Sequence, residues 1–142
     1  MQTGGLVVLI VALALATIAG LVLRARSGRV RATTPGRAAG AGGWELAGVA
    51  PDGRRALLLQ LSSPVCTPCR QTARLLGDLA AADPGLAHVE IDVAERIEVA
   101  RALGVLRTPT TVVFDAGGGE ILRISGVPRA GELTDALPSA PA

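Results

Sequence analysis

The two cysteines of this chain, Cys66 and Cys69, are separated only by Thr67 and Pro68. Two thiols at this spacing can close into a small disulfide ring or stand open as a dithiol. The thiolate is the nucleophile of disulfide exchange and also a metal ligand, so the pair indicates redox chemistry or metal binding. Two cysteines are too few for the disulfide framework of a small secreted domain. The pair is therefore the candidate site.

The pair lies between a predicted strand and a predicted helix. Ala56–Leu61 is an apolar run of strand length, interrupted by Gln60, and is typical of a central strand covered on both faces. Thr67–Ala82 carries apolar residues at spacings of three and four, which predicts a helix. Pro68 fits its first turn, where the missing N–H would have no partner.

The start of that helix favours a reactive thiolate. Its first backbone N–H groups are unpaired, and the helix dipole adds partial positive charge there. We therefore expect the pKa of the Cys66 thiol to be lowered, which makes Cys66 the attacking residue. Cys69 lies one turn further on, faces the core, and suits the resolving role.

The other elements complete an α/β pattern. From Ala56 onward the predicted order is β-α-β-α-β-β-α, which implies a three-layer sandwich with a mixed central sheet. The elements after the first helix are a strand over Leu86–Val93, a helix over Glu95–Leu103, a hairpin of Thr110–Asp115 and Glu120–Ser125, and a short final helix through Leu137. The helix over Glu95–Leu103 is expected to turn four apolar residues inward: Ile97, Val99, Ala100 and Leu103. Trp44–Arg55 holds at most one brief strand or helical turn.

The N-terminal segment, residues 1–23, contains a transmembrane pattern. Gly4–Leu23 is a 20-residue run whose only polar side chain is Thr17. As a helix it would span about 30 Å, the thickness of a bilayer core. No positive charge precedes the run, which favours an uncleaved single-pass anchor over a cleaved signal peptide or a buried helix.

Arginines follow this run without any acid. Five lie within residues 24–43, whereas the chain from Trp44 onward has nine arginines and 12 acids. Residues 24–43 are interpreted as a flexible basic linker that contacts anionic lipid headgroups. The positive-inside rule places residues 24 onward in the cytoplasm, with an extracytoplasmic domain as the alternative. Residues 44–142 form the predicted folded domain, and with no basic domain we expect no nucleic-acid partner.

Over about residues 56–138 the chain resembles the thioredoxin family, and in particular short membrane-anchored thioredoxin-like proteins of actinobacteria. In that family a CxxC pair follows a central strand and opens a long helix, as Cys66 and Cys69 do. Thr108-Pro109-Thr110 resembles the cis-proline loop that faces the dithiol in the family. Gly126 matches a glycine that follows the second strand of the hairpin.

The resemblance implies a thioredoxin fold and assigns roles around the dithiol. Proline reduces the preference for the trans bond, and the Thr108 backbone could pair with an extended substrate segment beside Cys66. Substrate contacts are accordingly expected at Thr108, Pro109 and Val65. Supporting roles are expected for Thr67, Pro68, Gln60 and Gly126.

The chain departs from the family at residues that tune the dithiol. Val65 replaces the usual tryptophan, and Thr67-Pro68 replaces Gly-Pro. Gln60 occupies the place of a buried acid, and His88 roughly that of its lysine partner. The segment before Ala56 is too short for the family's full first strand and helix.

These observations predict a membrane-tethered protein-disulfide reductase with no metal and no cofactor. Its expected partners are disulfide-containing proteins, an electron donor that the sequence does not identify, and membrane lipid. Two alternatives remain: an extracytoplasmic thiol reductase or oxidase, and a non-catalytic membrane adaptor or metal-binding module on the same fold. A zinc site needs about four ligands, so it would require cysteines from two chains.

Overall fold

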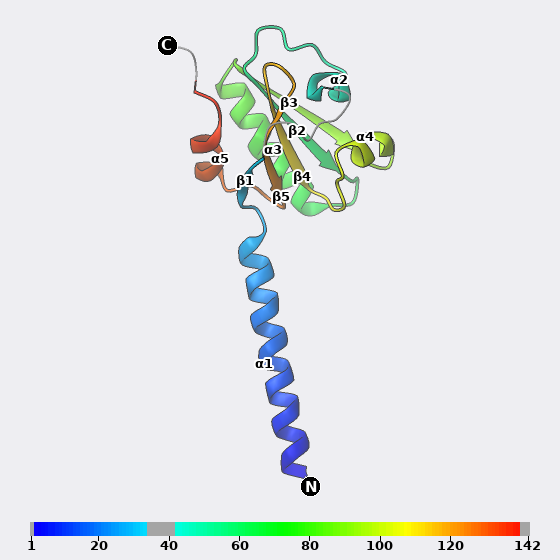
Figure 1. The fold of residues 1–142 in the computed structure, drawn as a ribbon, viewed down its shortest axis with the longest axis vertical. Helices are drawn as coiled ribbons and strands as arrows, with labels where there is room; N and C mark the ends of the chain where they lie inside the picture. The colour runs from blue at the N-terminus through cyan, green and yellow to red at the C-terminus, as the bar shows by residue number, and fades with distance from the viewer. Residues whose placement is uncertain (1, 34–41, 140–142) are drawn as a thin grey trace.

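The computed structural model describes residues 2–33 and 42–139, and it has the predicted α/β sandwich (Figure 1). The sheet has five strands in the order β1-β5-β4-β2-β3. β2 and β3 run parallel, and the other neighbouring pairs are antiparallel, which confirms a mixed sheet. The strands are β1 (Val30–Ala32), β2 (Ala56–Ser62), β3 (Leu86–Asp92), β4 (Thr110–Asp115) and β5 (Glu120–Ser125).

Helices cover both faces of this sheet. The helices of the domain are α2 (Gly43–Ala47), α3 (Thr67–Ala82), α4 (Ile97–Ala102) and α5 (Ala130–Ala136). α2 and α4 pack on one face, where Trp44 and Val99 meet Phe114. α3 and α5 pack on the other face, where Leu76 and Leu133 belong to the same buried cluster.

Strand β2 is the centre of the fold because its side chains are buried on both faces. All seven of its residues are buried, and it pairs with β3 on one side and β4 on the other. Leu57, Leu59 and Leu61 pack toward α2 and α4, whereas Ala56 and Leu58 pack toward α3 and α5. Its carboxyl end leads directly into the segment that carries the dithiol.

Helix α1 (Gln2–Arg26) projects from the domain and packs on none of it along most of its length (Figure 1). It has 25 residues, and the stretch Gly4–Arg26 is long and apolar enough to cross a membrane. Its apolar side chains are exposed, in contrast to those of a core helix. It extends to Arg26, three residues beyond the expected end at Leu23.

The structure corrects two expectations. Val30–Ala32 was expected in the flexible linker but forms β1, which pairs with β5 and covers the hydrogen-bonding groups of its edge. The domain therefore has a short first strand and a short first helix, α2, ahead of β2; residues 34–41 lie outside the described part of the chain. Ile97, expected to face inward, is 52% exposed because α4 begins with it and spans only six residues.

Candidate active site

The cysteine pair lies at the start of α3, immediately after the sheet. Cys66 is the N-cap residue of α3, with an extended backbone, and its sulfur accepts a hydrogen bond from the Cys69 N–H at 3.2 Å. The two cysteines form a disulfide. Cys66 is half-buried, whereas Cys69 is 1% exposed. An incoming sulfur atom can therefore reach Cys66 and not Cys69.

Thr67 and Pro68 form the exposed first turn of α3. The Pro68 carbonyl accepts a hydrogen bond from the buried Thr72 hydroxyl at 3.0 Å. This bond joins the first turn to the second and holds the disulfide-bearing loop in its helical position.

The predicted proline loop lies beside this turn. The Thr108–Pro109 peptide bond is cis, and Pro109 is buried. The hydroxyls of Ser63 and Thr108 lie 3.4 Å apart, so the proline loop is joined to the segment that leads to Cys66. Register brings the same ends together, because Leu61 at the end of β2 pairs with Thr110 at the start of β4.

Gly126 closes the other side of the proline loop. Its N–H donates a 2.8 Å hydrogen bond to the Pro109 carbonyl. Its φ is +96°, and a Cβ atom there would lie 3.2 Å from the Gly28 backbone nitrogen. Both observations explain a glycine at this position.

Two apolar side chains project into solvent from the segments that meet here. Val65, immediately before Cys66, is 92% exposed, and Leu106, in the loop that leads to Pro109, is 97% exposed. Sequence reasoning selected Val65 and missed Leu106. The signal that could have identified Leu106 is that a large apolar residue lies in a predicted loop, where no strand or helix buries it.

Gln60 connects the dithiol to strand β3. It is fully buried, and its Nε2 donates to the Cys69 carbonyl at 2.9 Å. Its Oε1 lies 3.1 Å from His88 Nε2, and the Glu90 carboxylate lies 3.4 Å from Gln60 Nε2. Because the Cys69 carbonyl can only accept, the Gln60 oxygen must face His88. His88 therefore carries its proton on Nε2 when neutral.

Burial lowers the pKa of His88 from its ordinary value, and the Glu90 carboxylate opposes this shift. A depressed folded-state pKa means that the unfolded chain takes up a proton at His88 before the folded chain does. Folding stability is therefore lost as the pH falls below about 6.5, the ordinary histidine value.

We expect the His88→Gln variant to lose less stability than the wild type between pH 7.5 and 5.5. The variant lacks the titrating group but can still donate to Gln60, and the contribution removed is at most about 1.4 kcal/mol per pH unit. Urea unfolding of the full chain in detergent measures this slope. Carboxyl groups do not affect the slope in this pH range. Arginine partners lower the pKa values of Asp83, Glu98 and Glu132, so the stability that these groups contribute is lost only near and below their ordinary range of about 4. Equal slopes for the two proteins would contradict the role given to His88.

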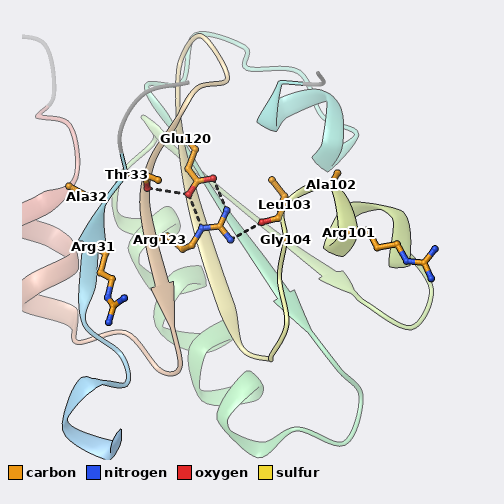
Figure 2. Close-up of a pocket in the computed structure, with 9 residues that line it drawn as sticks. All are labelled: Arg31, Ala32, Thr33, Arg101, Ala102, Leu103, Gly104, Glu120 and Arg123. Atoms are coloured by element: carbon orange, nitrogen blue, oxygen red, sulfur yellow. Dashed lines mark hydrogen bonds and ion pairs between the residues drawn. The ribbon is translucent and has the colours of Figure 1, made fainter. Parts of the chain in front are cut away.

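A second polar cluster lies on β5, around Glu120 and Arg123 (Figure 2). The Arg123 guanidinium donates to both carboxylate oxygens of Glu120 and to the Leu103 carbonyl at 2.9 Å. Thr33 donates to the same carboxylate at 3.1 Å, and Glu120 is 2% exposed. This cluster joins β5 to the end of β1 and to the residues after α4.

Known proteins resemble this chain in sequence. The model of the thioredoxin-like domain family matches residues 44–141. A putative thioredoxin of Arabidopsis thaliana is 34% identical over 49% of this chain and 45% of its own length. A thioredoxin of Oryza sativa subsp. japonica is 35% identical over 51% and 53%. The chain thus spans about half the length of the curated relatives it matches.

Solved structures agree on the fold. Chloroplastic thioredoxin z superposes with a TM-score of 0.56 at 26% identity, covering 67% of this chain and 86% of that one. A mutant thioredoxin from Halobacterium salinarum gives a TM-score of 0.54 at 27% identity, covering 60% and 76%. The fold is the thioredoxin fold with a CxxC disulfide at the start of its first long domain helix. The chain belongs to the thioredoxin-like domain family.

Proposed function

We propose that this chain is a membrane-tethered thiol–disulfide oxidoreductase that reduces protein disulfides through Cys66 and Cys69. The observation that carries the proposal is the pairing of an accessible Cys66 at a helix N-terminus with a buried Cys69. The cis-proline loop tied beside them supplies the expected place for an extended substrate segment.

Reduction proceeds by two exchange steps. The Cys66 thiolate, stabilised by the start of α3, attacks one sulfur of a substrate disulfide and forms a mixed disulfide while the other substrate sulfur leaves as a thiolate. Cys69 then loses its proton and attacks the Cys66 sulfur, which releases the second substrate thiolate. Two electrons have passed to the substrate, and an electron donor must reduce the Cys66–Cys69 disulfide for the next cycle.

The supporting residues act through this geometry. Gln60 holds the Cys69 carbonyl, and Gly126 holds the Pro109 carbonyl, so the two sides of the site keep their spacing. Thr67 and Pro68 shape the exposed turn between the cysteines. The exposed side chains of Val65 and Leu106 supply apolar contact with substrate.

The membrane part of the proposal rests on α1. Its length, apolar composition and exposure suit a single-pass anchor, and its basic C-terminal flank favours a cytoplasmic domain in contact with anionic lipid. A reporter fused after Leu137 tests this topology. Activity of the reporter outside the cytoplasm would instead support an extracytoplasmic reductase or oxidase.

Insulin reduction by the full chain in lipid nanodiscs, with dithiothreitol as donor, tests the activity. We expect turnover well above the dithiothreitol background. The competing hypothesis is a metal-binding module, for which the described residues offer no cluster of three or more histidine, cysteine or acidic side chains. Stoichiometric zinc in the purified chain, together with absent turnover, would favour that hypothesis.

A further inference from the structure

The end of α1 lies at the same edge of the domain as the dithiol. β2 ends at this edge, β4 begins there, and β5 ends there, because Leu61 pairs with Thr110 and Thr110 pairs with Ser125. β1 begins at this edge as well, since Val30 pairs with Ile124. The chain therefore passes from α1 into the sheet at the end of the strands that carries the redox site, and not at the opposite end (Figure 1).

A chain of hydrogen bonds connects the end of α1 to the segment that carries the dithiol. Gly28, two residues after the end of α1, donates to the Ser125 carbonyl at 2.7 Å. Gly126, the residue after Ser125, donates to the Pro109 carbonyl at 2.8 Å. The hydroxyls of Thr108 and Ser63 then join the proline loop to the segment that leads to Cys66. Gly28 follows the last residue of α1 by two residues, which span about 7 Å when extended. A membrane that holds α1 thus lies close to the face that carries the dithiol.

An arginine-lined pocket lies between α1 and the proline loop. It has a volume of about 110 Å³ and is lined by Arg26, Arg29, Arg31, Arg107, Arg123 and Ser125. These arginines come from four places in the chain: the end of α1, β1 with the turn before it, the proline loop and β5. Three arginines from the end of α1 and from β1 with its preceding turn therefore share one site with two arginines from much later in the chain.

Little negative charge balances this pocket. Glu120 pairs with Arg123, and Figure 2 shows the Arg31 side chain pointing away from that pair. Glu132 approaches Arg29 but forms its ion pair with Arg129. Among the described residues, no ion pair joins a carboxylate to Arg26, Arg29, Arg31 or Arg107. The pocket is therefore suited to a ligand with concentrated negative charge.

We propose that this pocket binds the phosphate of an anionic phospholipid and thereby holds the dithiol edge of the domain against the bilayer. Guanidinium groups form paired hydrogen bonds with phosphate oxygens, which suits a site built from arginines alone. Lipid is the ligand that the position favours, because Arg26 ends the apolar helix at the depth of the headgroups. The inference rests on the membrane anchor of the proposed function, and it restricts the partners to proteins whose cysteines lie near the membrane surface.

The test measures access to Cys66 in the reduced full chain. A bulky, membrane-impermeant maleimide is added to nanodiscs of phosphatidylcholine alone or with phosphatidylglycerol, and labelling at Cys66 is followed by peptide mass. We expect several-fold slower labelling in the anionic discs. Neutralising one surface arginine weakens lipid attraction by roughly fivefold. The Arg29→Gln/Arg31→Gln variant should therefore label at nearly the same rate in both discs.

The matched control removes two arginines elsewhere. Arg54 lies before β2 at the opposite edge of the sheet, and Arg74 lies on the exposed side of α3. The Arg54→Gln/Arg74→Gln variant should keep the slow labelling in anionic discs. Loss of protection in this control as well would show a general charge effect and overturn the pocket assignment.

The remaining outcomes separate this proposal from the proposed function. Equal labelling of the wild type in the two lipids overturns the docking proposal alone, and insulin reduction remains to be judged on its own. Slow labelling in phosphatidylcholine discs after addition of inorganic phosphate would make a free anion the ligand and overturn the lipid assignment. Failure of the chain to enter nanodiscs removes the anchor and this proposal together, but leaves the dithiol chemistry testable.

Discussion

Replacing Cys66 by serine is expected to abolish disulfide reduction. A hydroxyl at this position is not ionised at neutral pH and cannot take part in sulfur exchange, whereas the Cys66 thiolate at the start of α3 is the proposed attacking group. Cys69 cannot substitute for it, because its side chain is 1% exposed. Loss of an enzyme's nucleophile lowers the rate on the order of a thousandfold or more. Insulin reduction by the Cys66→Ser chain in nanodiscs should fall to the dithiothreitol background.

A remote conservative change provides the control. Thr134 lies on the exposed surface of α5, and its hydroxyl donates only within its own helix. The Thr134→Ser variant should reduce insulin at the wild-type rate. Unchanged turnover in Cys66→Ser would show that the oxidoreductase proposal is wrong.

Replacing Cys69 by serine is expected to stop the cycle after the first step. Cys66 keeps its position at the helix N-terminus and can still form a mixed disulfide. The buried residue that would resolve this intermediate then lacks a nucleophilic sulfur. The substrate should remain attached to Cys66, while turnover falls nearly as far as in Cys66→Ser.

Mass analysis under non-reducing conditions detects the trapped adduct. It should form at Cys66 in the Cys69→Ser chain, and no adduct should accumulate in Cys66→Ser. Adducts through Cys69 in the Cys66→Ser chain would contradict the assignment, because they would make the buried cysteine the attacking residue.

The elements around the dithiol were predictable from local patterns. β2 is buried on both faces and therefore reads as a continuous apolar run, and α3 shows helical spacing from Cys69 to Leu76. The hairpin strands β4 and β5 were found at their observed boundaries because a glycine-rich turn separates two β-rich runs. These signals lie within the elements themselves, so no knowledge of the tertiary structure was needed.

Features that depend on distant contacts were not predictable in the same way. β1 has three residues, too few for a periodic signal, and it forms because the edge of β5 is available. The arginine pocket joins Arg31 to Arg107 and Arg123, which are far apart in the sequence. Because residues 24–43 were interpreted as a linker, the sequence did not indicate that the fold brings Arg31 close to the other two arginines.

The surroundings of Gln60 were predictable only in part. Through the resemblance to thioredoxins, the sequence matched Gln60 to the family's buried acid and His88 roughly to the lysine partner of that acid. The structure adds the order of the contacts: Gln60 donates to the Cys69 carbonyl and its oxygen faces His88. That order depends on which amide atom meets which partner, and spacing along the chain carries no such information.

The central claim is that Cys66 and Cys69 exchange electrons as a pair. Equilibration of the full chain with graded mixtures of reduced and oxidised glutathione, followed by alkylation and intact mass, tests it directly. We predict a reversible two-electron transition between dithiol and disulfide, with a potential in the range of about −270 to −120 mV found for related redox proteins. A pair that stays fully reduced or fully oxidised across all mixtures would contradict the account.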